Sequence, residues 1–257
     1  MRKFYLNENI YGHLSRLDFL KRHISKNASV LEFGCGTGCM VTLPLVLEGY
    51  DVTGIDLDEK SIEYGRHAFE DNNCDPKRLV CKRIEDLPDK FDVIIASEVL
   101  EHIPNSQIDN KLKCIFDKLK YNGVLLVTVP NGYGWFELES FLWFGAKVGW
   151  VLERSQLIKV WYKMKYSLFG VYRDCPYLST LSSSPHVQHF TLSGIKRLLQ
   201  NNGFEITDTE GTVLFAGPIS DTLFTGIEPV MVANRWLGRH LKTIAAGFML
   251  CARKNDT

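Results

Sequence analysis

Several features that identify common classes of protein are missing from this sequence of 257 residues. Charge of one sign is not in excess, since 30 Lys and Arg residues balance 30 Asp and Glu residues, and this argues against a dedicated nucleic-acid binder. The 7 cysteines, an odd number, form no Cys-x-x-Cys pair and have no accompanying pair of closely spaced histidines. Neither a zinc finger nor a disulfide framework is therefore expected, and free thiols suit a reducing compartment.

The sequence also lacks a hydrophobic run long enough to cross a membrane. The longest candidate, 141–152, is short and contains Lys147, whereas a spanning helix needs roughly 20 apolar residues. The first ten residues have no apolar core of the kind found in a secretory signal. A composition of 45% hydrophobic and 23% charged residues is typical of a folded globular protein, so we expect a cytoplasmic one.

The sequence does contain an alternation of short apolar runs and amphipathic stretches. The apolar runs predict strands at 29–33, 51–55, 79–84, 91–96 and 123–129. The amphipathic stretches predict helices at 9–25, 38–48, 58–71 and 106–120. Buried strands that alternate with helices imply a doubly wound α/β fold, with a mostly parallel sheet covered on both faces.

Two interruptions of this alternation lie beyond Pro130. A helix at 191–202 and strands at 204–213 and 245–252 resume the pattern. We therefore predict a single domain over 1–257, with an aromatic-rich cap insertion at 133–190 and a second insertion at 215–244.

The clearest functional motif is VLEFGCGTG at 30–38, a strand that leads through three glycines into a helix. Glycines permit a sharp turn, and the helix start offers free N–H groups, so a nucleotide-type cofactor is expected there. The dinucleotide fingerprint would place its last glycine where Cys39 stands. Glu32 would repel a pyrophosphate but attract a cation. S-Adenosylmethionine fits this requirement, because it carries a sulfonium and an ammonium but no phosphate.

Candidate cofactor residues also follow the next strands. Asp56 ends the second strand, where a carboxylate can bind both ribose hydroxyls, and the adjacent Leu57 can cover one adenine face. Ile84 and Glu85 end the third strand, where the adenine edge would lie. The predicted cofactor-binding set is Glu32, Gly34, Cys35, Gly36, Gly38, Asp56, Leu57, Ile84, Glu85, Ser97 and Glu98.

Together these motifs resemble those of the class I S-adenosylmethionine-dependent methyltransferases, nearest to the ubiquinone-biosynthesis O-methyltransferase-like branch. The segments that carry the resemblance are 30–38, 52–56, 84–88, 91–102 and 123–130. The resemblance implies a Rossmann-like, seven-stranded sheet whose last strand is antiparallel. It also implies methyl transfer, which we expect to be O-methylation of a small or lipid-like acceptor. A nucleotide-dependent oxidoreductase and a non-catalytic S-adenosylmethionine-binding module remain the alternatives.

Two groups of side chains are candidates for metal binding or for general base catalysis. Glu98, Glu101 and His102 would share one face of a helical turn, and the resemblance implies a divalent metal there. The sequence favours the simpler alternative, in which Glu98 is a cofactor-side acid and His102 packs. His186 and His189 lie before the helix predicted at 191–202. Either is a candidate general base, because an imidazole titrates near neutral pH.

Aromatic residues are concentrated in the cap, where 133–172 holds 12 of the 30 in the chain. Basic residues accompany them at 154–173, and others occur without any acid at 229–255. This combination suits an enlarged core, an aromatic lid over a bulky apolar acceptor, or the headgroup layer of a membrane. We predict peripheral membrane contact through 133–173 and 229–255 and no nucleic-acid partner. We also expect the first helix to close over the cofactor with Tyr5, Tyr11 and His13.

Overall fold

The computed structural model describes residues 10–169 and 186–255. Within them the strands are β1 (Ser29–Phe33), β2 (Asp51–Asp56), β3 (Leu79–Cys81), β4 (Phe91–Ser97), β5 (Leu119–Pro130), β6 (Phe204–Gly211) and β7 (Gly247–Lys254). The α-helices are α1 (His13–Arg22), α2 (Thr42–Leu47), α3 (Glu59–Asp71), α4 (Asn105–Lys118), α5 (Trp135–Ser140), α6 (Val148–Arg154), α7 (Leu157–Phe169), α8 (Leu192–Asn201), α9 (Pro218–Phe224) and α10 (Glu228–His240). Short helical turns are η1 (Pro76–Arg78), η2 (Ile84–Asp86), η3 (Leu100–His102), the π-helical η4 (Phe141–Gly145) and η5 (Lys242–Ile244).

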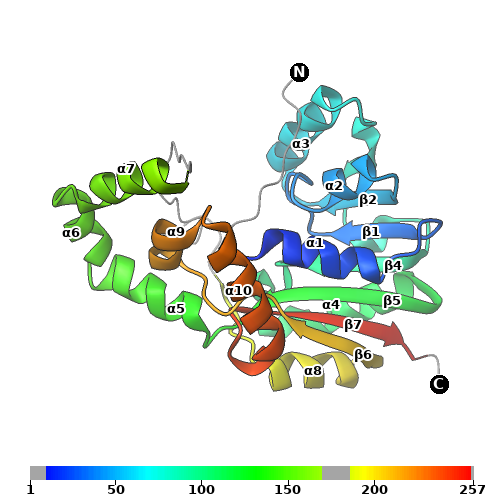
Figure 1. The fold of residues 1–257 in the computed structure, drawn as a ribbon. Coiled ribbons are helices and arrows are strands. Elements are labelled where there is room, and N and C mark those ends of the chain that lie inside the picture. The colour runs from blue at the N-terminus through cyan, green and yellow to red at the C-terminus, as the bar shows by residue number, and fades with distance from the viewer. Residues whose placement is uncertain (1–9, 170–185, 256–257) are drawn as a thin grey trace.

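These strands form one sheet in the order β3-β2-β1-β4-β5-β7-β6. The strands from β3 to β5 pair in parallel, and β7 runs antiparallel to both β5 and β6. The predicted seven-stranded, mostly parallel α/β fold is thus confirmed (Figure 1). The chain reverses its direction of winding between β1 and β4, and in such sheets ligands bind at the carboxyl ends of the strands beside that switch.

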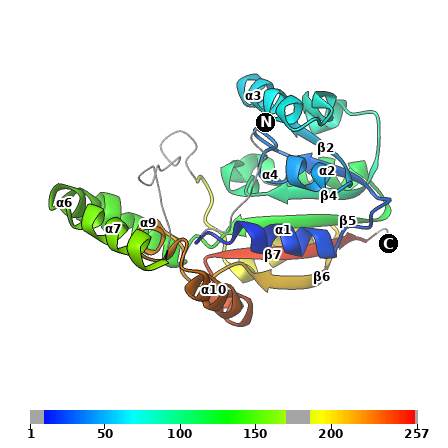
Figure 2. The same ribbon diagram turned by 45° about the horizontal axis from the view of Figure 1, so that its top comes forward.

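Two apolar layers cover the sheet, because successive side chains of a strand point to opposite faces. Val30 packs with Leu17 and Leu20 of α1, and α1 lies along the sheet in Figure 2. Leu31, the next residue of β1, packs in the opposite layer with residues of α4 and α8 such as Leu112. The core therefore holds β1 rigidly and fixes the position of the loop that follows it.

Some predicted boundaries differ from those observed. The strand predicted at 79–84 ends at Cys81, because β3 is an edge strand whose pairing with β2 stops there. The strand predicted at 245–252 lies at 247–254. It is buried between β5 and β6, and Lys254 donates to the Leu119 carbonyl at 3.2 Å. The prediction that 229–255 contacts a membrane is therefore wrong for β7.

The helices of the two predicted insertions lie together beside the sheet. We call residues 135–169, which comprise α5, η4, α6 and α7, the arm, and Figure 1 shows it extending away from the sheet. Glu139 of α5 is buried and accepts a hydrogen bond from the Ser220 backbone N–H of α9 at 2.7 Å. Among the described helices, we find none with the length and apolar character that a membrane span requires.

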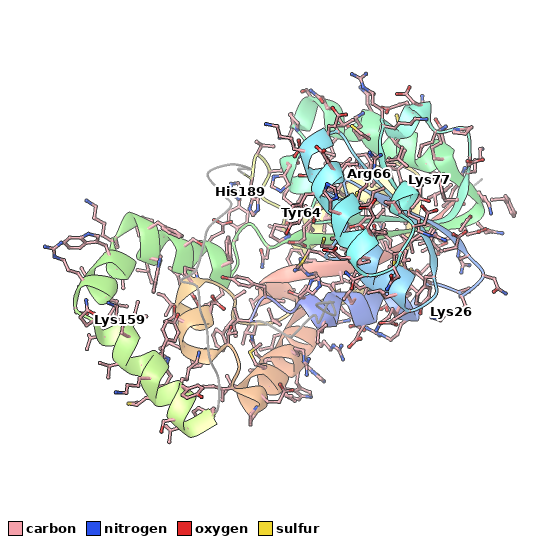
Figure 3. All side chains as sticks on the ribbon, turned by 90° about the horizontal axis from the view of Figure 1, so that it is seen from above. Lys26, Tyr64, Arg66, Lys77, Lys159 and His189 are labelled. Atoms are coloured by element: carbon pink, nitrogen blue, oxygen red, sulfur yellow. The ribbon has the colours of Figure 1, made fainter. Side chains whose placement is uncertain are left out.

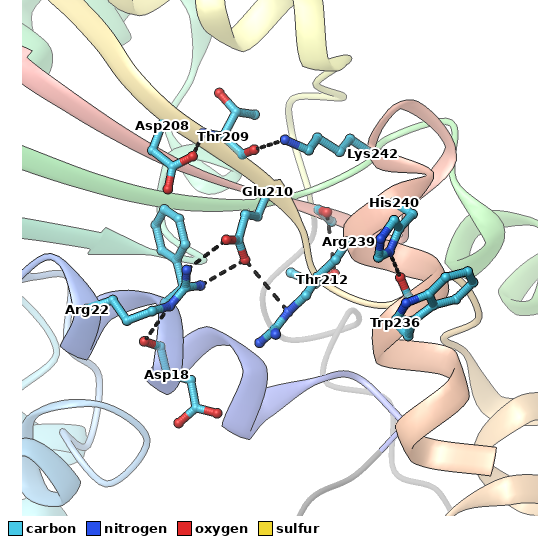
Figure 4. A network of polar contacts seen from close by, with 12 residues as sticks. Asp18, Arg22, Asp208, Thr209, Glu210, Thr212, Trp236, Arg239, His240 and Lys242 are labelled. Atoms are coloured by element: carbon cyan, nitrogen blue, oxygen red, sulfur yellow. Dashed lines mark hydrogen bonds and ion pairs between the residues drawn. The ribbon is translucent and has the colours of Figure 1, made fainter. Parts of the chain in front are cut away.

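Ion pairs fasten α1 to the far edge of the sheet (Figure 4). Both terminal nitrogens of Arg22 donate to the carboxylate of Glu210 in β6, each at 2.8 Å. Arg239 of α10 lies 3.7 Å from the same carboxylate. These contacts hold α1 in place, and α1 forms one wall of the candidate active site.

Candidate active site

Two cavities lie at the carboxyl ends of the central strands. The first has a volume of about 530 Å³. It is lined by residues of α1, of the loop 34–38 after β1, which we call the glycine loop, and of the end of β4, and by His186. The second, about 260 Å³, is lined by residues at the end of β2, by η2 and by the start of α4. Gly34 and His102 line both, so the cavities adjoin. An elongated ligand can therefore occupy the two together.

The glycine loop shapes the wall between β1 and the first cavity. Gly34 has a φ of +71°, and a Cβ on it would collide with the Val99 side chain. Gly36 has a φ of +54° and open space where a Cβ would stand, so a ligand can approach its backbone closely. Gly38 lines neither cavity; it forms the turn into α2, with a φ of +67° and the Leu79 side chain against it.

Asp56 lies at the second cavity with both carboxylate oxygens oriented by backbone donors. The Gly36 N–H donates to Oδ2 at 2.7 Å, and the Asp58 N–H donates to Oδ1 at 2.9 Å. Each oxygen keeps a further lone pair for a ligand hydroxyl. Leu57 and Ile84 line the same cavity, so three of the predicted ribose and adenine residues are brought together.

Glu85 is placed elsewhere. Its carboxylate accepts a hydrogen bond from Lys111 Nζ of α4 at 2.6 Å, and it lines neither cavity. The sequence pattern offers no sign of this partner, because the two residues are far apart along the chain.

Glu32 is buried beneath the first cavity. Both the backbone N–H and the hydroxyl of Thr42 donate to its Oε2. Burial raises the pKa of Glu32 to about 7, although the hydrogen bonds from Thr42 act in the opposite direction. A positively charged ligand would favour the ionised carboxylate, so the cavity contains a carboxyl suited to a cation.

Cys35 and Ser97 complete the walls of the first cavity. Burial raises the pKa of the Cys35 thiol, which therefore stays protonated and unreactive. The Ser97 hydroxyl lies 2.9 Å from the Thr128 hydroxyl of β5, which in turn donates to Glu98 Oε1 at 2.9 Å. This chain of polar groups orients Glu98.

Arg16 of α1 is a functional candidate that the sequence analysis missed. Its Nη1 lies 3.1 Å from Glu98 Oε2, and both residues line the first cavity. Its Nε is buried and has no hydrogen-bond partner among the described residues. Glu98 adopts a φ of +53°, which is unusual for a residue other than glycine. No sequence signal links the two residues, since one belongs to a helical periodicity and the other to a strand end.

The sequence predicts that the first helix closes over the cofactor with His13 and the tyrosines. His13 is buried and lines the first cavity, and its burial lowers its pKa to about 4, so it is neutral at physiological pH. Tyr11 precedes α1 and is half-buried, and Tyr5 lies outside the described residues.

Glu101, His102 and His186 form a cluster in the lining of the first cavity, and their ligating atoms lie within 4.8 Å of one another. Burial, followed by the charge of Glu98, raises the pKa of Glu101 well above its usual value. Glu101 Oε2 has no hydrogen-bond partner among the described residues. This buried, unpaired oxygen and two imidazoles fit a divalent cation. The set differs from the predicted one, because Glu98 faces Arg16 and His186 takes its place.

The two candidate bases are separated. His186 lines the first cavity, and its Nδ1 lies 3.7 Å from Glu137 Oε1 of the arm. His189 is exposed, stands beside the ring of Tyr133 and lines neither cavity (Figure 3). The geometry therefore offers His186 and not His189 to a bound ligand.

A glycine loop and a carboxylate after the second strand, both beside the switch point of the sheet, define an α/β protein that binds a nucleoside-containing ligand. Comparison with known proteins makes the assignment more specific. The family model described as "Methyltransferase domain" matches residues 7–209, so the chain belongs to this family of methyltransferases.

Curated relatives include two enzymes named ubiquinone biosynthesis O-methyltransferase. The one from Chromobacterium violaceum is 39% identical over 98 residues, which cover 36% of this chain and 41% of that protein. The one from Rickettsia akari is 36% identical over 135 residues, 51% of this chain and 49% of that protein. This chain thus matches about half the length of these relatives or less.

Solved structures share the fold. A methyltransferase from Methanosarcina mazei has a TM-score of 0.55 at 18% identity, over 92% of this chain and 96% of that one. Magnesium protoporphyrin IX methyltransferase from Synechocystis has a TM-score of 0.54 at 14% identity, over 99% of this chain and 89% of that one. At these identities the likeness shows the fold alone.

Proposed function

We propose that this chain is an S-adenosylmethionine-dependent methyltransferase that methylates an oxygen of a small or lipid-like acceptor. The observation that carries the proposal is the pair of adjoining cavities. One is lined by Asp56, whose carboxylate can accept ribose hydroxyls, and the other is lined by acidic groups, an arginine and His186. Family membership and the names of the curated relatives support it.

The charges of the first cavity match those of the cofactor's methionine portion. That portion carries an ammonium, a sulfonium and a carboxylate. Glu32 and Glu98 supply negative charge for the cations, and Arg16 supplies a guanidinium for the carboxylate. Asp56 accepts the ribose hydroxyls in the second cavity, with Leu57 and Ile84 against the adenine. A diphosphate would be repelled by the same acids.

The proposed reaction is an in-line displacement at the methyl carbon. His186 accepts the proton of an acceptor hydroxyl, and the oxygen forms a bond to the methyl carbon. The carbon–sulfur bond breaks, its electron pair stays on sulfur, and S-adenosylhomocysteine leaves. Glu137 lies beside His186 and can stabilise the imidazolium that forms. Holding donor and acceptor in line supplies much of the rate.

A divalent cation fits the cluster described above. Glu101, His102 and His186 would hold it. When bound, it would supply positive charge that lowers the pKa of an acceptor hydroxyl. His186 would then serve as a ligand instead of a base, so the two roles are alternatives for one side chain.

Acceptor screening with methyl-labelled S-adenosylmethionine tests the proposal. We expect label transfer to hydroxylated aromatic or lipid acceptors. Saturating S-adenosylhomocysteine, at about 100 times its dissociation constant, should stabilise the fold by about 2.7 kcal/mol. Stabilisation by NAD instead would favour the oxidoreductase. Cofactor binding without transfer to any acceptor would favour the non-catalytic module.

A further inference from the structure

The arm, residues 135–169, contacts the rest of the protein along one side of α7. The indole Nε1 of Trp161 donates to the Thr222 carbonyl of α9 at 3.1 Å. Lys165 Nζ donates to the same carbonyl at 3.2 Å and is buried. These contacts fix which side of α7 faces inward, and therefore which side faces solvent.

An exposed apolar stripe runs along α7 beside this inward side. Leu157, Val160, Met164 and Leu168 follow one another at steps of three and four residues, which places them on one face of the helix. They are between 46% and 68% exposed. Such a continuous apolar face is uncommon on a protein surface without a partner.

Other exposed aromatic side chains occur in the rest of the arm. Phe141 and Phe144 of η4 and Trp150 of α6 are exposed. The Arg154 guanidinium lies 5.3 Å from the centre of the Trp150 ring. An arginine stacked on an exposed tryptophan offers an apolar body with a charged end, which is the arrangement that side chains adopt at the boundary between lipid chains and headgroups.

The charge of the arm points to the nature of the partner. The arm contains five basic and three acidic residues, and two of the acids lie in α5, so 141–169 holds five basic residues and one acid, whereas the chain as a whole is neutral. Lys147, Arg154, Lys159 and Lys163 are exposed, and Lys159 is labelled on the arm in Figure 3. On α7, Lys159 and Lys163 lie along one side of the apolar stripe. Apolar residues bordered by cations complement a layer of lipid chains beneath anionic headgroups.

We propose that the arm docks on a membrane surface rich in anionic phospholipid. The stripe of α7 and the aromatic residues of η4 and α6 enter the boundary between chains and headgroups, while the surrounding lysines and Arg154 bind the phosphates. This proposal rests on arm residues outside both cavities, so it does not depend on methyl transfer. It narrows the predicted surface at 133–173 to these side chains.

Sedimentation with vesicles tests the docking in the full chain. Wild type should bind vesicles of phosphatidylcholine mixed with phosphatidylglycerol, and bind phosphatidylcholine alone at least about tenfold more weakly. The double variant Val160→Ser and Leu168→Ser should lose about tenfold or more in affinity for the mixed vesicles. The matched control, Leu47→Ser with Tyr121→Ser, changes exposed apolar residues outside the arm and should bind as wild type does.

Charge variants separate the electrostatic contribution to vesicle binding from the apolar contribution. Lys159→Gln with Lys163→Gln should lose about tenfold on mixed vesicles and little on phosphatidylcholine, whereas Lys77→Gln with Lys113→Gln should change neither. Unchanged affinity for S-adenosylhomocysteine would establish that each variant folds. Absence of wild-type binding to mixed vesicles would overturn the proposal. Light scattering could instead show that the wild type is a dimer and that the double variant Val160→Ser and Leu168→Ser is a monomer. That result would also overturn the proposal, because a second copy of the chain would then cover the stripe.

Discussion

Replacing Glu32 with Gln should change stability and cofactor binding in opposite directions. The native pKa of this buried carboxyl is about 7, against 4.5 for an ordinary glutamate. One unit of pKa corresponds to ~1.4 kcal/mol, so the ionised carboxylate destabilises the native state by roughly 3 kcal/mol. Stability conferred by the protonated group is complete below pH 4.5 and is lost as the pH rises through about 7.

Glutamine keeps an oxygen acceptor for Thr42 but does not ionise. The free energy of unfolding of Glu32→Gln should therefore equal that of wild type near pH 4.5. By pH 8 it should exceed the wild-type value by roughly 3 kcal/mol. Urea denaturation of the cofactor-free protein across this range measures the difference. Glu85→Gln is the control, because it breaks a partly exposed ion pair and should cost less than ~1 kcal/mol.

Cofactor affinity should fall in Glu32→Gln, although stability rises, because the cationic groups of the cofactor no longer face a carboxylate. At pH 8 we expect the dissociation constant of S-adenosylmethionine to rise about 10- to 100-fold in Glu32→Gln. Wild-type affinity should strengthen as the pH rises through about 7 and then level off. Calorimetric titration measures both. A variant that is no more stable at pH 8, or that binds cofactor as tightly as wild type, would refute the role assigned to this carboxyl.

Four further results are expected at the site. Asp56→Ala should weaken S-adenosylhomocysteine binding about 100-fold in calorimetry, because the ribose loses two charge-assisted hydrogen bonds. Arg16→Met should weaken the same ligand about tenfold but leave methylthioadenosine, which has no carboxylate, unchanged. His186→Ala should lower kcat by about 100-fold or more without changing cofactor affinity, while His189→Ala should alter neither. Zn²⁺ titration of chelator-treated protein should show a site that is lost in Glu101→Gln; equal heats in both proteins would contradict the cluster.

Local patterns predict the fold and the cofactor side of the site well. Gly34 follows β1 and Asp56 ends β2, and parallel strands end at the same edge of a sheet, so the motif alone places them together. The charge of Glu32 alone predicts a role beside a cationic cofactor. The structure adds the burial that raises its pKa, which depends on Thr42 and the packing of α2.

Contacts between distant segments could not be predicted from the sequence. His186 reaches His102 because the backbone N–H groups of residues 187 and 188 donate to the Glu101 carbonyl, which lies far away along the chain. The pairing of Arg16 with Glu98 likewise needs α1 to lie across the sheet. Such long-range contacts leave no periodic trace in a single sequence.

The position of β7 has a consequence for assembly of the sheet. The strand lies between β5 and β6, yet it follows both along the chain. Until it inserts, each of its neighbours presents an unpaired edge of backbone N–H and C=O groups, which can bind another extended segment instead. Nascent chains that stop short of residue 247 are therefore expected to be prone to aggregation, although they already contain every residue that lines the two cavities.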